Sequence, residues 1–153
     1  MEAKIRRTQD NLFVLGTSVI AFGLWNLIKF TVYFFFNSDD IKQAVDEKYF
    51  IFSIIVTWVM FFISFLLRCF IGISARAEGK GKRKSVLYLV FTGIIMSVYF
   101  LIIVFETFFF IFQLEHIFTM VVTLIIDITS FMFLLELMIN SIRIRHLRRE
   151  VSK

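Results

Sequence analysis

Four long apolar segments, separated by short polar stretches, dominate the hydropathy pattern of the chain. They cover residues 12–36, 49–73, 86–112 and 117–142. About 20 apolar residues cross a bilayer as a helix, so each segment is long enough to span it with some tilt. Each segment also carries polar or small residues at helical spacing along one face. This pattern predicts an all-α integral membrane protein: one domain over residues 1–153, folded as an antiparallel four-helix bundle with polar interior faces.

Composition argues against a soluble protein. Of the 153 residues, 59% are hydrophobic and 19% are charged, and the mean hydropathy is +0.83. Soluble domains have about 45 to 50% apolar and 25% charged residues. A soluble globular fold is therefore excluded, and too few residues lie outside the four segments to form a nucleotide-binding or catalytic domain.

The basic residues are unevenly distributed over the connections between the segments. Thirteen of the 17 Lys and Arg residues precede the first segment, join the second to the third, or follow the fourth, whereas the first connection has only Lys42 and Lys48. Short basic loops stay on the cytoplasmic side, so we expect a multi-pass plasma-membrane protein with both termini cytoplasmic. We also expect the second connection and the basic tail, residues 143–153, to contact anionic lipid headgroups. The residues assigned to these contacts are Lys80, Lys82, Arg83, Lys84, Arg145, Arg148 and Arg149.

An outer layer of ionisable side chains is predicted within the apolar segments, where a charge costs about 2.5 to 3.5 kcal/mol at mid-membrane. Counting 1.5 Å per residue places Lys29, Glu106 and Asp127 at similar depth in the outer half of the bilayer. One lysine cannot neutralise two carboxylates. We therefore expect one of the acids to be protonated, or to exchange a proton or small cation. The polar residues assigned to the same layer are Asn26, Tyr33, Tyr99 and Thr123.

An inner layer is predicted from Arg68 and Glu136, which lie at matching depth by the same counting. Glu136 follows Asp127 by nine residues, so it lies on the opposite side of the fourth helix. Its own face includes Asn140 and Arg143. Two interpretations stay open: Glu136 pairs sideways with Arg68 or Arg143, or this face contacts another protomer or a partner protein.

Enzymatic chemistry finds little support in the sequence. His116 and His146 lie at opposite membrane faces, which excludes a haem, a metal cluster or a catalytic triad built on histidines. No phosphate-binding glycine loop, GxSxG turn or CxxC pair occurs. We expect no catalytic residues, no metal and no cofactor, with an intramembrane carboxylate enzyme as a minor alternative. The basic run after residue 79 has no interleaved aromatic residues, so no nucleic-acid partner is expected.

Two functions fit these features. The first is a small transport or conduction unit, expected to be oligomeric, that moves a proton, cation or small polar solute past Lys29, Glu106 and Asp127. The second is a non-transporting accessory, regulatory or immunity-type membrane protein that recognises a partner membrane protein through the Glu136 face. Proton or cation flux in liposomes separates the two, and the structure bears on them through whether the polar faces enclose water or close dry on one another.

Overall fold

The computed structural model describes residues 2–82, with a gap at 37–46, and residues 85–151, with a gap at 113–116. This part of the chain is helical almost throughout. Its elements are α1 (Glu2–Phe36), α3 (Glu47–Gly79), α4 (Leu87–Phe112) and α5 (Ile117–Val151). Each helix is long and apolar enough to cross a membrane, which confirms the all-α prediction and indicates a multi-pass membrane protein.

Three helices extend beyond the apolar segments that the sequence delimits. α1 begins at Glu2, α3 continues to Gly79 and α5 continues to Val151, because the charged residues at these ends are good helix formers. α3 ends in a Schellman motif, in which the Gly81 amide donates to the Glu78 carbonyl oxygen (3.0 Å) and the Lys82 amide to that of Ala77 (3.1 Å). Gly81 has φ +87°, a left-handed conformation that favours glycine.

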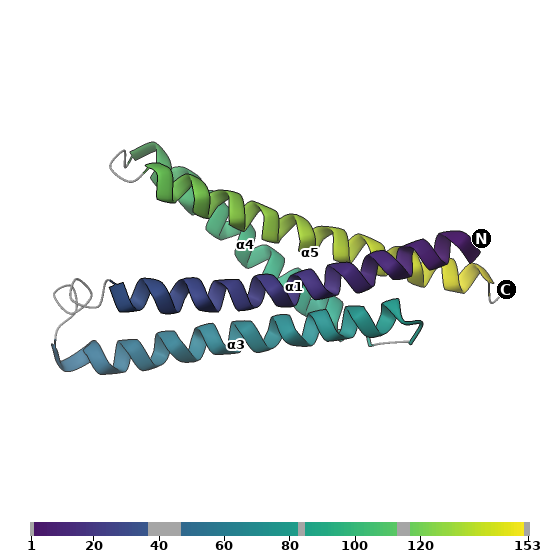
Figure 1. The fold of residues 1–153 in the computed structure, drawn as a ribbon, viewed down its shortest axis with the longest axis horizontal. Coiled ribbons are helices and arrows are strands. Elements are labelled where there is room, and N and C mark those ends of the chain that lie inside the picture. Colours follow the sequence, from purple (N-terminus) through teal and green to yellow (C-terminus); the bar gives the residue numbers. More distant parts are fainter. Residues whose placement is uncertain (1, 37–46, 83–84, 113–116, 152–153) are drawn as a thin grey trace.

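The helices run antiparallel, and both chain termini lie at one end of the molecule (Figure 1). We call this the terminal end and the opposite one the open end, because the pair α1 and α3 diverges from the pair α4 and α5 towards it (Figure 1). α1 packs most extensively against α3 and also contacts α5, which packs on α4, whereas α3 and α4 contact each other little. The hydrophobic core therefore lies mainly in the terminal half, where buried side chains include Leu12, Ile71, Tyr88, Leu137 and Ile144.

Glycines allow α1 and α3 to approach closely. Gly16 on α1 faces Gly72 on α3, and a Cβ atom added to Gly16 would lie 2.6 Å from the Gly72 carbonyl oxygen. About two turns further along α3, a Cβ atom added to Gly79 would lie 2.7 Å from the carbonyl oxygen of Gln9 on α1. Small residues at such positions let membrane helices pack backbone against backbone. The α1–α3 pair is therefore a tightly packed unit.

Aromatic side chains extend this unit towards the open end. Phe30 of α1 stacks on Phe61 of α3 with ring centroids 3.8 Å apart, and it meets Trp58 edge to face at 5.2 Å. Such pairs stabilise by about 0.5 to 1.5 kcal/mol beyond the area they bury. Some of the many phenylalanines thus join helices and do not merely face lipid.

Candidate functional site

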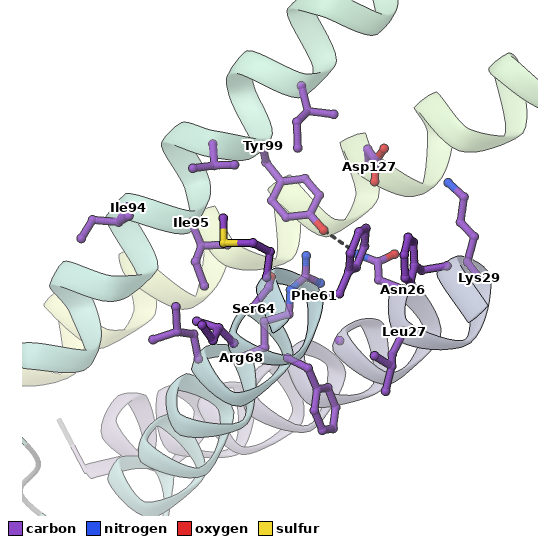
Figure 2. Close-up of a pocket in the computed structure, with 18 residues that line it drawn as sticks. Asn26, Leu27, Lys29, Phe61, Ser64, Arg68, Ile94, Ile95, Tyr99 and Asp127 are labelled. Carbon is purple, nitrogen blue, oxygen red and sulfur yellow. Dashed lines mark hydrogen bonds between the residues drawn. The ribbon is translucent and has the colours of Figure 1, made fainter. Parts of the chain in front are cut away.

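A cavity of about 680 Å³ lies between the α1–α3 pair and α4. Most of its wall is apolar, whereas polar and charged side chains gather on one side of it (Figure 2). α1 contributes Asn26 and Lys29, α3 contributes Arg68, α4 contributes Tyr99, and α5 reaches the cavity through Asp127. Residues of both α3 and α4 line the cavity, and these two helices contact each other little.

Arg68 is held at the polar side by side chains from two other helices. It is only 5% exposed, and its guanidinium carbon lies 4.8 Å from the centre of the Tyr99 ring. The Asn26 amide contacts the Tyr99 hydroxyl at 2.6 Å (Figure 2). With its oxygen turned towards the donors, Asn26 accepts from that hydroxyl and from Nη2 and Nη1 of Arg68, at 3.1 and 3.3 Å. These contacts join α1, α3 and α4 around one buried cation.

The remaining ionisable groups adjoin Arg68 on the α5 side. Lys29 Nζ donates to Thr123 Oγ1 at 3.3 Å, which links α1 to α5. Asp127 is buried, 8% exposed, and its carboxyl group interacts electrostatically with that of Glu106 on α4. Asp127 also interacts electrostatically with both Lys29 and Arg68. Each of the four helices therefore contributes one ionisable side chain to the same region.

The predicted inner layer of Arg68 and Glu136 is wrong. Arg68 lies with Asn26, Tyr99 and Asp127, whereas Glu136 is exposed on α5. The depth of Arg68 was counted from residue 73, but α3 continues to Gly79, so Arg68 lies further from the terminal end of its helix than that counting gave. Arg68 thus balances the outer layer, which now has two bases and two acids.

The other residues of the predicted Glu136 face are divided between two environments. Asn140 is buried, 7% exposed, and its amide donates to the Glu136 carbonyl oxygen at 2.9 Å. Arg143 is exposed, like Glu136 itself. Tyr33, predicted beside Asn26, is on α1, but its side chain lies outside the described residues.

The basic residues assigned to headgroup contacts lie in different environments. Lys80 and Lys82 are exposed, and so is Arg149, while Arg83 and Lys84 lie outside the described residues. Arg145 and Arg148 instead bind within the protein. Arg145 Nε donates to Glu78 Oε1 at 3.0 Å, and Arg148 Nη2 donates to the Glu78 carbonyl oxygen at 3.0 Å. These two guanidinium groups therefore bind α3, while contact of the basic residues with lipid headgroups stays a prediction.

Sequence reasoning missed the buried cluster at the terminal end to which Arg145 belongs. Glu78 is 1% exposed, and its carboxylate accepts a hydrogen bond from the Tyr88 hydroxyl. That hydroxyl also lies 2.6 Å from Ser141 Oγ. The cluster joins α3, α4 and α5. Glu78 follows the apolar segment 49–73, where hydropathy falls, so the sequence does not indicate that it is buried; the i, i+4 spacing of Ser141 and Arg145 is the available signal.

Among the described residues, no group of three or more His, Cys, Asp or Glu side chains is arranged to hold a metal ion. Comparisons of the chain with protein-family models, with curated proteins and with solved structures gave no match.

Proposed function

We propose that the chain is a small membrane transport unit, in which the cavity holds the transported group and the Glu106–Asp127 pair exchanges a proton. One observation carries this proposal: four ionisable side chains, one from each helix, meet beside a cavity and leave it open. Such groups are expensive in a membrane and typically mark substrate or proton pathways.

The way these charges are arranged favours transport over a purely structural role. Mutually neutralised pairs would fix helix register, but within the described part of the chain neither Lys29 nor Arg68 forms a direct salt bridge with Glu106 or Asp127. Lys29 binds Thr123, and Arg68 binds Asn26. The charges are thus grouped around the cavity without closing it.

The two carboxyl groups supply the site for the proton. Two carboxylates that interact this closely repel each other when both are ionised, so we expect one of the two to hold a proton. Glu106 Oε2 is buried and, among the described residues, has no hydrogen-bond partner. Buried oxygens are normally paired, so this atom can accept a proton that reaches it through its neighbour Asp127, which lines the cavity.

The distribution of basic residues indicates which end of the bundle faces the cytoplasm. Because basic connections stay on the cytoplasmic side, the terminal end with Lys80 and Lys82 is placed in the cytoplasm of a cell whose plasma membrane holds the protein. The open end then faces outwards, and the buried core of the terminal half separates the cavity from the cytoplasm.

We expect Asp127→Asn and Glu106→Gln to lower proton flux in liposomes by about 100-fold, the low end of what a positioned proton-transfer group contributes. Both substitutions keep the size of the side chain but remove the exchangeable acid. Flux is measured with a pH-sensitive dye inside the liposomes after a potassium gradient and valinomycin impose a membrane potential. Glu136→Gln, on the exposed face of α5, is the matched control and should retain wild-type flux. Equal flux in the wild type and both acid variants would refute the proposal.

A second function, that of an accessory protein acting through helix contacts, rests on the exposed face of α5. Glu136 and Arg143 are both exposed and, seven residues apart, lie on one face with Met132 and Ile139. A carboxylate turned towards lipid is costly unless a neighbouring helix covers it.

If this face mediates association, Glu136→Ala should raise the dissociation constant of the oligomer about tenfold, equivalent to 1.4 kcal/mol. The substitution removes the carboxylate, and with it the cost of exposing a charge to lipid that favours association. Particle mass is measured in detergent over a dilution series, and Met132→Ala, an apolar change on the same face, is the control. A mass distribution that Glu136→Ala leaves unchanged counts against this second function.

A further inference from the structure

The cavity walls are unsuited to a small hydrophilic solute. Away from its polar side the cavity is lined by aliphatic and aromatic side chains, among them Phe61 and Ile63 of α3 and Ile95 of α4 (Figure 2). Apolar walls give a hydrated ion or a sugar nothing to replace its water contacts, whereas they fit an acyl chain. A volume of about 680 Å³ lies within the range of pockets that take one compact organic ligand.

The polar side of the cavity favours an anion. The ionisable groups that line it are Lys29, Arg68 and Asp127; with the proton of the proposed function on the adjoining Glu106, two positive charges face one negative charge. The Arg68 guanidinium has five donors, and within the described part of the chain only Asn26 accepts hydrogen bonds from it. Lys29 likewise has donors beyond its bond to Thr123. A carboxylate or phosphate placed here would balance the charge, and guanidinium binds both groups with paired hydrogen bonds.

Access to the cavity is from the side. Among the residues that line it, Ile63 of α3 and Ile94 and Val98 of α4 are exposed on the outer surface of the bundle. An acyl chain could therefore enter from the bilayer without leaving hydrocarbon. An acyl chain gains little free energy by moving from lipid into an apolar cavity. The polar head must therefore determine which amphiphiles bind.

We propose that this cavity binds a single-chain amphiphile with an anionic head, the head at Arg68 and Lys29 and the chain along the apolar walls of α3 and α4. The inference rests on the proposed transport function, since it names the substrate class of the same cavity. The anionic head is either the carboxylate of a fatty acid or the phosphate of a lysophospholipid, and the test separates these two sources.

The test measures binding to the purified full-length chain in detergent, by displacement of a dansyl-labelled fatty acid. The competitors have equal chain length and differ in their heads: a fatty acid, a lysophosphatidic acid, a lysophosphatidylcholine and an alcohol. We expect one or both anionic competitors to bind at least about tenfold more tightly than the alcohol, as charge-assisted hydrogen bonds would give. Tight binding of only one anionic competitor identifies the source. Equal binding of all four competitors overturns the proposal.

Substitutions place the ligand in the cavity. Arg68→Gln should weaken binding of the anionic competitors about tenfold and leave the alcohol unchanged, while Arg143→Gln, on the exposed face of α5, should change neither. Val98→Trp, at an exposed position on the cavity rim, should weaken every competitor because the ring occupies the chain path. It provides the test if Arg68→Gln fails to fold. If neither Arg68→Gln nor Val98→Trp alters binding, the site is elsewhere and the proposal is wrong.

The outcome is distinguishable from that of the transport experiment. Selective binding of an anionic amphiphile without proton flux in liposomes would refute the transport function but support the amphiphile-binding site. Proton flux that depends on Asp127, without selective binding of an anionic competitor, would support the transport function and refute the proposal that the cavity binds an amphiphile.

Discussion

Gly72→Leu is expected to destabilise the folded bundle by about 3 kcal/mol, the upper range for overpacking a close contact. A Cβ atom at position 72 would overlap the carbonyl oxygen of Gly16 and lie 2.5 Å from Cγ1 of Ile20. The Ile20 side chain can change rotamer, but the backbone oxygen can move only if α1 and α3 separate. The loss is measured by titrating the detergent-solubilised protein with sodium dodecyl sulfate and following helix content by circular dichroism.

Gly93→Leu on α4 provides the matched control. Nothing lies within 4 Å of a Cβ atom built at Gly93, and leucine is a better helix former than glycine by about 0.8 kcal/mol. We therefore expect this variant to unfold at the same detergent concentration as the wild type, or a higher one. Similar losses at both positions would show that the α1–α3 approach is not what makes Gly72 sensitive.

The inward faces of the helices could be predicted from the sequence because they follow directly from helical periodicity. A repeat of 3.6 residues places Asn26 and Lys29 on one face of α1, and the seven-residue spacing of Tyr99 and Glu106 places both on one face of α4. Of the seven side chains assigned to the outer layer, the six whose positions the structure describes do meet near the cavity. Tyr33 is the seventh.

Helix ends could not be predicted in the same way. Hydropathy falls wherever Lys, Arg and Glu begin, although these residues continue a helix readily. The end of α3 was therefore placed before Glu78, which concealed the terminal cluster and misplaced Arg68 in depth. A Schellman glycine, Gly81, was the better signal for the end of this helix.

The cavity itself depends on how the two helix pairs tilt, and local sequence does not determine that tilt. Close approach of α1 and α3 at Gly16 and Gly72 has a sequence signal in small residues. The divergence of α3 from α4 results from many weak long-range contacts, so no motif records it. The apolar wall around Ile63 and Ile95 had the same composition as a face turned to lipid.

The terminal cluster gives the last prediction, in which two partners of one ion pair differ in sensitivity. Arg145→Leu should destabilise the fold by about 3 to 5 kcal/mol, the cost of leaving a buried charge unpaired. The side chain of Glu78 is 2% exposed, whereas that of Arg145 is 22% exposed. Glu78 without its partner would stay buried among Tyr88 and Ser141, but Arg145 without its partner can turn towards water or headgroups.

Glu78→Gln should therefore cost only about 1 kcal/mol, the net value of an ordinary hydrogen bond. The double variant, Glu78→Gln with Arg145→Leu, should be more stable than Arg145→Leu alone, because no buried charge is left without a partner. The same detergent titration measures the full double-mutant cycle. Arg143→Leu, at an exposed position two residues earlier on α5, should leave stability nearly unchanged. Additive losses in the cycle, or a loss at Arg143 equal to that at Arg145, would show that Glu78 and Arg145 do not act as a pair.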